Sequence, residues 1–301
     1  MTQTANATGS RRLYKLRKLP LASGAALELG ARTLIMGILN VTPDSFSDGG
    51  RYTDVDAAVA GARRMATEGA DILDIGGEST RPGHAKVSAE EELRRVLPAI
   101  RAVRRELPHM PISIDTYKAE VAREALAAGA DIINDVWRLT ADSGMARVAA
   151  EHNCPVILMH NREQAVYAGD IIEEMARDLQ TSVELALQAG VDPGRIVLDP
   201  GIGFAKTYEH NLEVMQRLGE LIDLLPGYPM LLATSRKSFI RRALDLPADD
   251  VVEGTAATVA LGISQGCEIV RVHDVKPMRR IADMTDAIVR RGAVLPEQLV
   301  F

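Results

Sequence analysis

The sequence has little cysteine, no long apolar run and no surplus of basic residues. Its two cysteines, Cys154 and Cys267, lie far apart, each at the start of a predicted strand. We expect small buried hydrophobic side chains rather than a disulfide or metal ligands, which fits a reducing cytoplasm. No stretch reaches the ~18 uncharged apolar residues of a membrane span. The formal net charge of −6 argues against a nucleic-acid-binding protein, which would show a basic face.

Eight short apolar runs recur along the chain, and almost every one ends on a polar or charged residue. Runs such as TLIMGIL, PISI and PVILM are typical of parallel strands buried on both faces. Amphipathic stretches lie between the runs, at residues 56–68, 90–106 and 173–188, and we interpret them as outer helices with solvated Glu/Arg faces. Eight strand–helix units predict an α/β fold with a single (β/α)8 TIM barrel, in which catalytic residues sit at the C-terminal ends of the strands.

The predicted barrel covers residues 33–290, close to the ~250 residues typical of this fold. Residues 1–32 are predicted to form an N-terminal tail and a short hairpin, with its turn at Ser23 and Gly24, over the N-terminal mouth of the barrel. The basic segment RRLYKLRKLP within them faintly resembles a transit peptide but lacks the apolar core of a secretory signal. Residues 291–301 are expected to form a C-terminal tail.

Polar side chains follow four of the apolar runs directly or almost directly: Asp115, Asn134, Asp199 and Lys237. Any one of them could simply cap the next helix. On a barrel, however, all four would converge on one mouth, where two carboxylates, an amide and an ammonium can bind a flat heterocycle.

The last run carries a second candidate group. Arg271 and His273 are two residues apart and therefore share one face of a strand. Asn40 and Thr80, from the first two strand ends, could complete an anion site with them. Phosphate sites in such barrels gather near the last strands and nearby helix N-termini.

Several local patterns favour ordinary roles. The segment GFAKT at residues 203–207 imitates a phosphate loop but lacks the preceding glycine pattern. The histidines are scattered without metal-ligand spacing. His160 is either a structural cap or a wall of the site. A Schiff-base role for Lys237 is disfavoured, because nothing indicates a carbonyl substrate, although the adjacent Arg236 would depress the lysine pKa.

Two predicted loops are rich in Gly, Ser, Thr and Pro, at residues 40–50 and 76–83. Each loop holds one large side chain that differs from these small residues, Phe46 in the first loop and Arg81 in the second. An apolar ring in a polar loop at the mouth suggests a lid that excludes water. The alternative is that Phe46 pins its loop to the body of the protein.

Seven segments occur in order along the chain, one at nearly every predicted strand end: ILNVTPDSFSDGG, DIGGESTRPG, SIDTYK, IIND, LDPGIGF, TSRKSFI and IVRVHDV. In this order, and across residues 33–289, they closely resemble the dihydropteroate synthases of folate biosynthesis. The resemblance implies a transferase that joins p-aminobenzoate to 6-hydroxymethyl-7,8-dihydropterin diphosphate, giving 7,8-dihydropteroate and diphosphate. It further implies inhibition by sulfonamides, a homodimer and a cytoplasmic location.

The resemblance also implies roles for individual residues. The pterin would be held by Asp115, Asn134, Asp199 and Lys237. The diphosphate would be served by Asn40, Thr80, Arg271 and His273, with Mg2+ near Asn40. The p-aminobenzoate pocket would be shaped by Phe46, Pro82, Phe204, Lys237 and Ser238. Arg81 and Met159 would be further substrate contacts, and the catalytic set would be Asp115, Lys237, Arg271 and His273.

This chemistry agrees with the residue pattern. The pterin methylene can lose diphosphate dissociatively if the departing charge is held by Arg, His and Mg2+. The aromatic amine is neutral at pH 7, so no single general base is assigned, and positioning carries much of the acceleration. A pterin-binding methyltransferase barrel would not need the SRK, RVH and NVTPDSF segments, and a non-catalytic pterin binder should have lost at least one of Asn40, Lys237, Arg271 and His273.

Overall fold

A computed structural model of the chain describes residues 14–41, 51–78 and 86–291. Its centre is an eight-stranded sheet in which every paired strand is parallel to its neighbours, in the order β8-β7-β6-β5-β4-β3-β10-β9. The strands are β3 (Leu34–Asn40), β4 (Ile72–Gly76), β5 (Ile112–Asp115), β6 (Ile132–Asp135), β7 (Val156–Met159), β8 (Ile196–Asp199), β9 (Leu231–Leu232) and β10 (Ile269–Val272).

The two edge strands of this sheet meet and close it into a barrel. A parallel bridge joins Leu198 of β8 to Met230, just before β9. The Leu198 amide also donates a hydrogen bond to the Pro229 carbonyl at 2.9 Å. The predicted (β/α)8 barrel is therefore confirmed.

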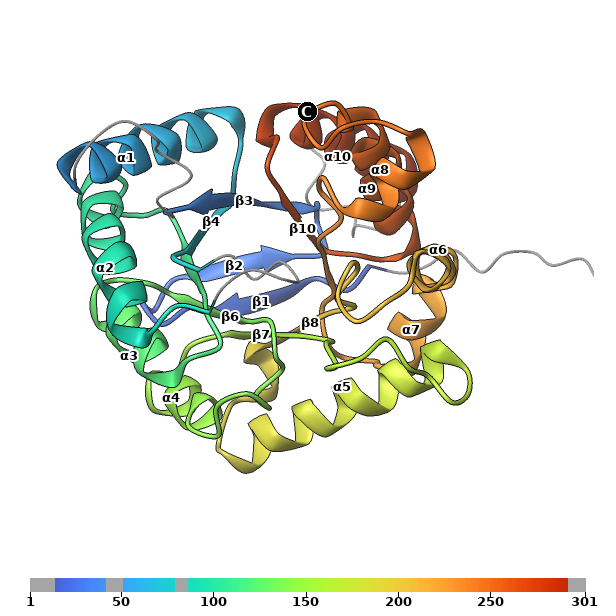
Figure 1. The fold of residues 1–301 in the computed structure, drawn as a ribbon, viewed down its shortest axis with the longest axis horizontal. Coiled ribbons are helices and arrows are strands. Elements are labelled where there is room, and N and C mark those ends of the chain that lie inside the picture. Colours follow the sequence, from blue (N-terminus) through green and yellow to red (C-terminus); the bar gives the residue numbers. More distant parts are fainter. Residues whose placement is uncertain (1–13, 42–50, 79–85, 292–301) are drawn as a thin grey trace, which may run out of the picture.

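Helices surround the barrel, as Figure 1 shows. They are α1 (Arg51–Glu68), α2 (Ala89–Glu106), α3 (Ala119–Ala127), α4 (Met145–Glu151), α5 (Ile171–Gln188), α6 (Tyr208–Gln216), α7 (Leu218–Leu224), α8 (Ser238–Leu244), α9 (Val252–Gln265) and α10 (Val275–Val289). The three predicted outer helices are confirmed within α1, α2 and α5. Within the described ranges, none of the helices has the length and apolar character needed to span a bilayer.

Alternate strand residues point to opposite sides of the barrel wall. One set, including Ile35, Leu73 and Ile112, packs in the layer between strands and helices. The other set forms a separate apolar cluster inside the barrel, and it contains Leu34, Met36, Ile72, Ile132, Ile157, Val197, Leu231, Ala233 and Ile269. The side of the strands that bears these residues is the side on which the site must be built.

An antiparallel hairpin covers the N-terminal end of the barrel (Figure 1). It consists of β1 (Arg17–Pro20) and β2 (Ala26–Leu29), and its turn contains Gly24 at φ +86°. Leu19, Leu21 and Leu29 are buried in the same cluster as the inward residues of the strands. The hairpin therefore closes this end of the barrel with apolar side chains.

A buried ion pair joins the last helix to the entrance of the first barrel strand. Asp286 of α10 accepts hydrogen bonds from the Thr33 amide at 2.6 Å and from the Thr33 hydroxyl at 2.8 Å. Arg290 donates to Asp286 at 2.5 Å and to the Gly30 carbonyl at 2.8 Å. Polar contacts thus join the last helix of the barrel to the start of its first strand.

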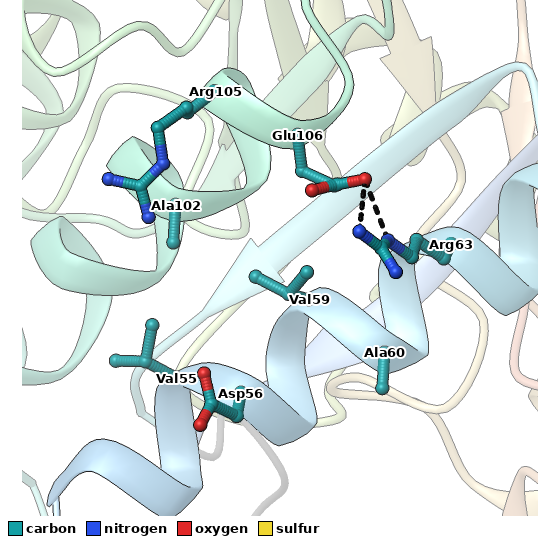
Figure 2. Close-up of a pocket in the computed structure, with 8 residues that line it drawn as sticks. All are labelled: Val55, Asp56, Val59, Ala60, Arg63, Ala102, Arg105 and Glu106. Carbon is teal, nitrogen blue, oxygen red and sulfur yellow. Dashed lines mark hydrogen bonds and ion pairs between the residues drawn. The ribbon is translucent and has the colours of Figure 1, made fainter.

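A cavity of about 540 Å³ lies in the helical layer. The described residues that line it come from α1 and α2, including Val55, Val59 and Ala102, and Arg63 and Glu106 form an ion pair beside it (Figure 2). Among the described residues, no strand contributes to the lining of this cavity.

Candidate active site

Four buried polar side chains stand on the inward side of neighbouring strands: Asp74, Asp115, Asn134 and Asp199. Asp115 and Asn134 are directly paired in the β5–β6 register, and Asp199 is paired with Met159 in the β7–β8 register. Asp74, Asn134 and Asp199 each lie two positions beyond an apolar inward residue of their strand, and Asp115 lies two positions beyond the buried Ser113. The predicted convergence of Asp115, Asn134 and Asp199 thus follows from strand alternation.

Arg271 of β10 reaches across the barrel to two of these carboxylates. Its Nε donates to Asp74 Oδ2 and its Nη2 to Asp115 Oδ2, both at 2.6 Å. Asn134 Nδ2 donates to the same Asp74 oxygen at 3.1 Å. Burial alone would lower the pKa of Arg271, but the charges of Asp74 and Asp115 raise it above its usual value. The guanidinium is thus a fixed positive charge inside the carboxylate cluster.

Asp74 was not among the predicted site residues. It lies within the run DILDI, which the sequence analysis took as part of a buried strand. The available signal was strand alternation, because Asp74 lies two residues before Gly76 and hence on the same side of β4. A charged residue at an inward position near the C-terminal end of a barrel strand is expected to serve the site.

The carboxylates have strongly perturbed acidities. Burial raises the pKa of Asp115 to about 7, although the charge of Arg271 opposes this. Burial likewise raises the pKa of Asp199 to about 6, against the hydrogen bond from the Gly201 amide. Among the described residues, Asp74 Oδ1 and Asp115 Oδ1 are buried without a hydrogen-bond partner. Buried acceptors of this kind are costly unless a donor is supplied, so both oxygens are suited to a ligand that carries N–H groups.

Lys237 and Phe204 form a second part of the site. Lys237 precedes α8, and its ammonium lies 4.1 Å from the centre of the Phe204 ring. Phe204 packs with Met159 and Val136 in a small apolar cluster. The structure therefore brings together three predicted residues, Lys237, Phe204 and Met159, as a cation beside an apolar wall. Ser238 follows Lys237 as the first residue of α8 and is exposed.

His273 lies one inward position beyond Arg271. Its amide donates to Ser235 Oγ at 3.1 Å, and its Nδ1 is 3.0 Å from the same oxygen. Arg271 and His273 do share a face, but the Arg271 guanidinium points into the carboxylate cluster. Ser235 was not predicted, although it stands in the TSRKSFI segment and fixes the histidine ring.

Asn40 is exposed at the C-terminal end of β3. A side chain on Gly76 would lie 3.4 Å from Asp115 Cβ and 3.9 Å from Asn40 Oδ1. The absence of a side chain at Gly76 therefore leaves the Asn40 amide oxygen and Asp115 open to one shared space. No group of three His, Cys, Asp or Glu side chains suited to a metal occurs in the parts of the chain that the structure describes.

Four predicted substrate contacts lie outside the described residues: Phe46, Thr80, Arg81 and Pro82.

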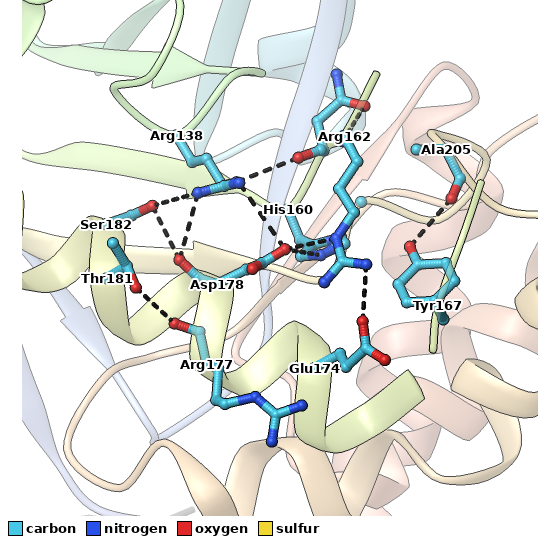
Figure 3. Close-up of polar contacts among 12 residues, drawn as sticks. Arg138, His160, Arg162, Tyr167, Glu174, Arg177, Asp178, Thr181, Ser182 and Ala205 are labelled. Atoms are coloured by element: carbon cyan, nitrogen blue, oxygen red, sulfur yellow. Dashed lines mark hydrogen bonds and ion pairs between the residues drawn. The ribbon is translucent and has the colours of Figure 1, made fainter. Parts of the chain in front are cut away.

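His160 belongs to a polar network that the sequence analysis missed (Figure 3). It is fully buried, and both of its ring nitrogens lie within hydrogen-bonding distance of other side chains in this network. Its Nε2 lies 3.1 Å from Asp178 Oδ2 on α5, and its Nδ1 lies 3.0 Å from Lys206 Nζ. Arg162 donates to Asp178 at 2.7 Å and to Glu174 at 2.9 Å. Burial, together with the Lys206 charge, lowers the pKa of His160 to about 3, so its ring is neutral.

Comparison with known proteins shows which family this chain resembles in sequence and in fold. The chain matches the family of pterin binding enzymes over residues 36–273. It is 58% identical to the dihydropteroate synthase of Bacillus subtilis, over 90% of this chain and 93% of that protein. A crystal structure of the Clostridium difficile dihydropteroate synthase, determined in the presence of pteroic acid, has a TM-score of 0.84 and 53% identity, covering 87% of this chain and 98% of that one.

A second solved structure, the Xanthomonas albilineans dihydropteroate synthase with 4-aminobenzoic acid, has a TM-score of 0.85 and 41% identity, covering 91% of this chain and 98% of that one. The motif order, the barrel and the buried carboxylate cluster agree with these similarities. The chain therefore belongs to the dihydropteroate synthases, which are transferases within the family of pterin binding enzymes.

Proposed function

We propose that the carboxylate cluster holds the pterin ring of 6-hydroxymethyl-7,8-dihydropterin diphosphate while p-aminobenzoate displaces the diphosphate to give 7,8-dihydropteroate. The observation that carries this proposal is a pair of buried acceptors, Asp74 Oδ1 and Asp115 Oδ1, for which no described residue supplies a hydrogen-bond donor. A pterin presents amide and amino N–H groups along one edge. Carboxylates can accept from these groups, and Asn134 offers both a donor and an acceptor.

The raised pKa of Asp115, about 7, gives binding a further consequence. N–H donors stabilise the ionised form of a carboxylate, so a bound pterin should lower this pKa. Binding near pH 7 would then release protons. The Arg271 guanidinium stays charged and supports the ionised form from the other side.

We assign the p-aminobenzoate site to the wall formed by Phe204, Met159 and Lys237. The apolar cluster can pack against the benzoate ring, and the ammonium can hold the pterin edge or the substrate carboxylate. Ser238, exposed beside Lys237, can complete this pocket with Phe46, Arg81 and Pro82. Sulfonamides resemble p-aminobenzoate in shape, so they should compete for the same wall.

We assign the diphosphate to His273, Asn40 and Thr80, with Arg271 balancing charge from the cluster beneath. Mg2+ prefers oxygen ligands and is usually held by one or two protein groups together with substrate phosphates. The exposed Asn40 amide oxygen fits such a site, and it faces the space shared with Asp115. A bound Mg2+ would neutralise charge on the departing diphosphate.

The described residues would then act mainly by binding and orientation. Asp74, Asp115 and Asn134 would anchor the pterin so that its methylene carbon faces the amine nitrogen. The C–O bond to diphosphate breaks with its electron pair leaving on the diphosphate, and positive charge develops on the pterin beside ionised carboxylates. The amine nitrogen then forms the new C–N bond and releases one proton to solvent. Since the aromatic amine is neutral at pH 7, its lone pair needs no base to activate it, and holding the two substrates in contact lowers the barrier.

The direct test is to incubate the purified protein with pterin diphosphate, p-aminobenzoate and Mg2+ and to detect dihydropteroate by mass spectrometry. Asp115→Asn is the matched control, because it keeps the size of the side chain but replaces an acceptor with a donor. We expect product with the wild type and little with the variant. A folded wild type that forms no product would refute the proposal.

We further propose that the protein is a homodimer that uses the α9–α10 side of the barrel. These two helices pack together and carry large exposed apolar side chains, with Met284 62% and Ile288 63% exposed on α10 and Leu261 exposed on α9. Apolar groups of this size are commonly covered by a partner. Sedimentation should show a dimer for the wild type and a monomer for Ile288→Arg; an unchanged mass would exclude this face.

We also propose a cytoplasmic location. Cys154 and Cys267 form no disulfide in the described structure and are both buried, which confirms their expected place in the core. Burial raises the pKa of Cys154 to about 12, so its thiol is unreactive. Fractionation of cells that express the full chain tests this location.

A further inference from the structure

The loop of residues 201–207, which follows β8, has an unusual backbone that many hydrogen bonds hold in place. Gly201, Gly203 and Ala205 all have positive φ, at +64°, +84° and +43°. Glycine adopts positive φ readily, but at the non-glycine residue Ala205 such a conformation persists only when surrounding contacts enforce it. The Gly201 amide donates to Asp199 Oδ1 at 2.7 Å, and the Gly203 amide donates to Asn211 Oδ1 at 2.6 Å.

Lys206 folds back and binds its own loop. Its ammonium donates to the carbonyls of Gly201 at 3.0 Å and Phe204 at 3.1 Å. The third neighbour is His160 Nδ1, also at 3.0 Å. A protonated lysine has three N–H groups and no acceptor, so these three partners satisfy it completely.

This arrangement fixes the tautomer of His160. Because Nδ1 accepts from Lys206, the ring proton must be on Nε2, where it can be donated to Asp178 Oδ2 at 3.1 Å. Asp178 is itself held by Arg162 (Figure 3). The loop is therefore connected through Lys206 and His160 to helix α5, rather than to its own flanking residues alone.

A second side chain holds the same loop from the β7–α5 connection. The Tyr167 hydroxyl donates to the Ala205 carbonyl at 3.0 Å (Figure 3). Three carbonyls of the loop are thus held in place: those of Gly201 and Phe204 by Lys206 within the loop, and that of Ala205 by Tyr167 from outside it. The segment between them presents Phe204 to the site.

The position of this segment matters because it contacts Lys237. The Phe204 ring lies 4.1 Å from the Lys237 ammonium. A side chain on Gly203 would come within 2.9 Å of Lys237 Cδ, which shows how closely the loop backbone approaches the lysine. A small shift of the loop would therefore change both sides of the wall assigned to p-aminobenzoate.

We propose that Lys206 is a positioning residue for p-aminobenzoate, holding the Phe204 side of its pocket through the Gly201 and Phe204 carbonyls and through His160. The proposal rests on the function proposed above. Lys206 contacts neither reacting group. It acts through the loop, so its removal should weaken the second substrate while leaving the carboxylate cluster intact.

The charge environment adds a pH dependence. Burial lowers the pKa of Lys206 to about 7; Asp199 and Asp178 oppose this, and Lys237 and Arg162 reinforce it. His160, the remaining titratable neighbour, stays neutral in this range. The ammonium is therefore complete below about pH 7 and loses a proton above it. One of its three hydrogen bonds disappears with that proton.

The test compares Lys206→Met with the wild type in steady-state kinetics. Loss of buried hydrogen bonds should raise the KM for p-aminobenzoate about tenfold, with the KM for pterin diphosphate within about twofold and kcat reduced less. The wild-type KM for p-aminobenzoate should also rise between about pH 6 and pH 8, and this rise should be absent in Lys206→Met. Lys276→Met, which removes an exposed lysine from α10, is the matched control and should behave as wild type.

Tyr167→Phe keeps the test decisive if Lys206→Met fails to fold. Removing one hydroxyl from the same loop should raise the KM for p-aminobenzoate in the same direction, by a smaller factor. Equal increases in both KM values, or no change in either variant, would overturn the positioning role. Failure of the proposed function is distinguishable, since the wild type itself would then form no dihydropteroate.

Discussion

At the scale of single residues, the site concentrates three carboxylates around one guanidinium. Asp74 and Asp115 share Arg271, whereas Asp199 is bound to the Gly201 amide. Burying a charge costs free energy unless it is paired and hydrogen-bonded, and two oxygens here lack a described partner. The ligand-free protein thus carries a cost that a pterin with matching N–H groups would remove.

Asp199→Asn should weaken pterin diphosphate binding while leaving the loop in place. The remaining amide oxygen can still accept from the Gly201 amide, but the new NH2 group would face a ligand donor. We expect a loss of about 2–3 kcal/mol in binding free energy. Calorimetry on the folded variant measures this, and an unchanged affinity would remove Asp199 from the pterin site.

The same residue should make stability depend on pH. The folded-state pKa of Asp199 is about 6, above the ordinary 3.8. The folded state therefore binds this proton more tightly, so the contribution of Asp199 is most favourable below about pH 4 and is lost as the pH rises through 6. The difference in unfolding free energy between wild type and Asp199→Asn should shift against the wild type by about 3 kcal/mol across this range.

Urea unfolding of both proteins without ligand, at about pH 4 and about pH 7.5, provides the measurement. A difference that stays constant between the two conditions would contradict the raised pKa.

At the scale of elements, the hairpin β1–β2 is a structural lid on the non-catalytic end. Leu29 is fully buried among the inward residues of the strands. Leu29→Ala should lower the unfolding free energy by about 2–5 kcal/mol, because it leaves a cavity. Both KM values should remain near wild type, since the hairpin is at the opposite end from the carboxylates. A large change in either KM would show that the hairpin shapes the site.

The elements were predictable because each barrel strand is buried on both faces and so appears as a short apolar run. The limits of β9 were not, since only Leu231 and Leu232 pair with β10, although the apolar run PMLLA is longer. The convergence of Asp115, Asn134 and Asp199 also followed from strand ends. Asp74 was missed because it lies inside the apolar run DILDI, and the whole run was interpreted as a buried strand rather than searched for site residues.

Lys206 was beyond sequence reasoning for a different cause. Its partner His160 is 46 positions away, and the bond between them exists only because β7 and β8 are adjacent in the sheet. The segment GFAKT therefore resembled a phosphate loop, and nothing in the sequence indicated that its lysine contacts His160. The role of Arg271 within the carboxylate cluster was hidden in the same way, since Asp74 is 197 positions distant.

At the scale of the whole molecule, the barrel is closed twice. The β8–β9 bridge closes the sheet, and the buried contacts among Asp286, Arg290 and Thr33 fasten the last helix to the first strand. The contact between Thr33 and Asp286 joins residues that are 253 positions apart in the sequence. The ion pair is thus a long-range link that only the complete fold can form.

Asp286→Ala should destabilise the protein strongly, because it leaves Arg290 buried without its carboxylate. Breaking a buried pair in this way costs about 3–5 kcal/mol. The double variant Asp286→Leu/Arg290→Met removes both charges and should recover much of that loss. Urea unfolding of the three proteins decides the matter: a mild effect of Asp286→Ala, or no recovery in the double variant, would mean that the pair is not the main fastening.

The apolar plug formed by Leu19, Leu21 and Leu29 makes the barrel a cup with a single opening. Substrates and products must then enter and leave through the C-terminal end of the barrel. A molecule that binds against Asp74 and Asp115 therefore has to enter before the molecule that binds nearer the opening. A molecule of p-aminobenzoate or of a sulfonamide that enters first would stand in the path of the pterin. The depth at which each substrate binds therefore sets the order in which the two substrates enter the site.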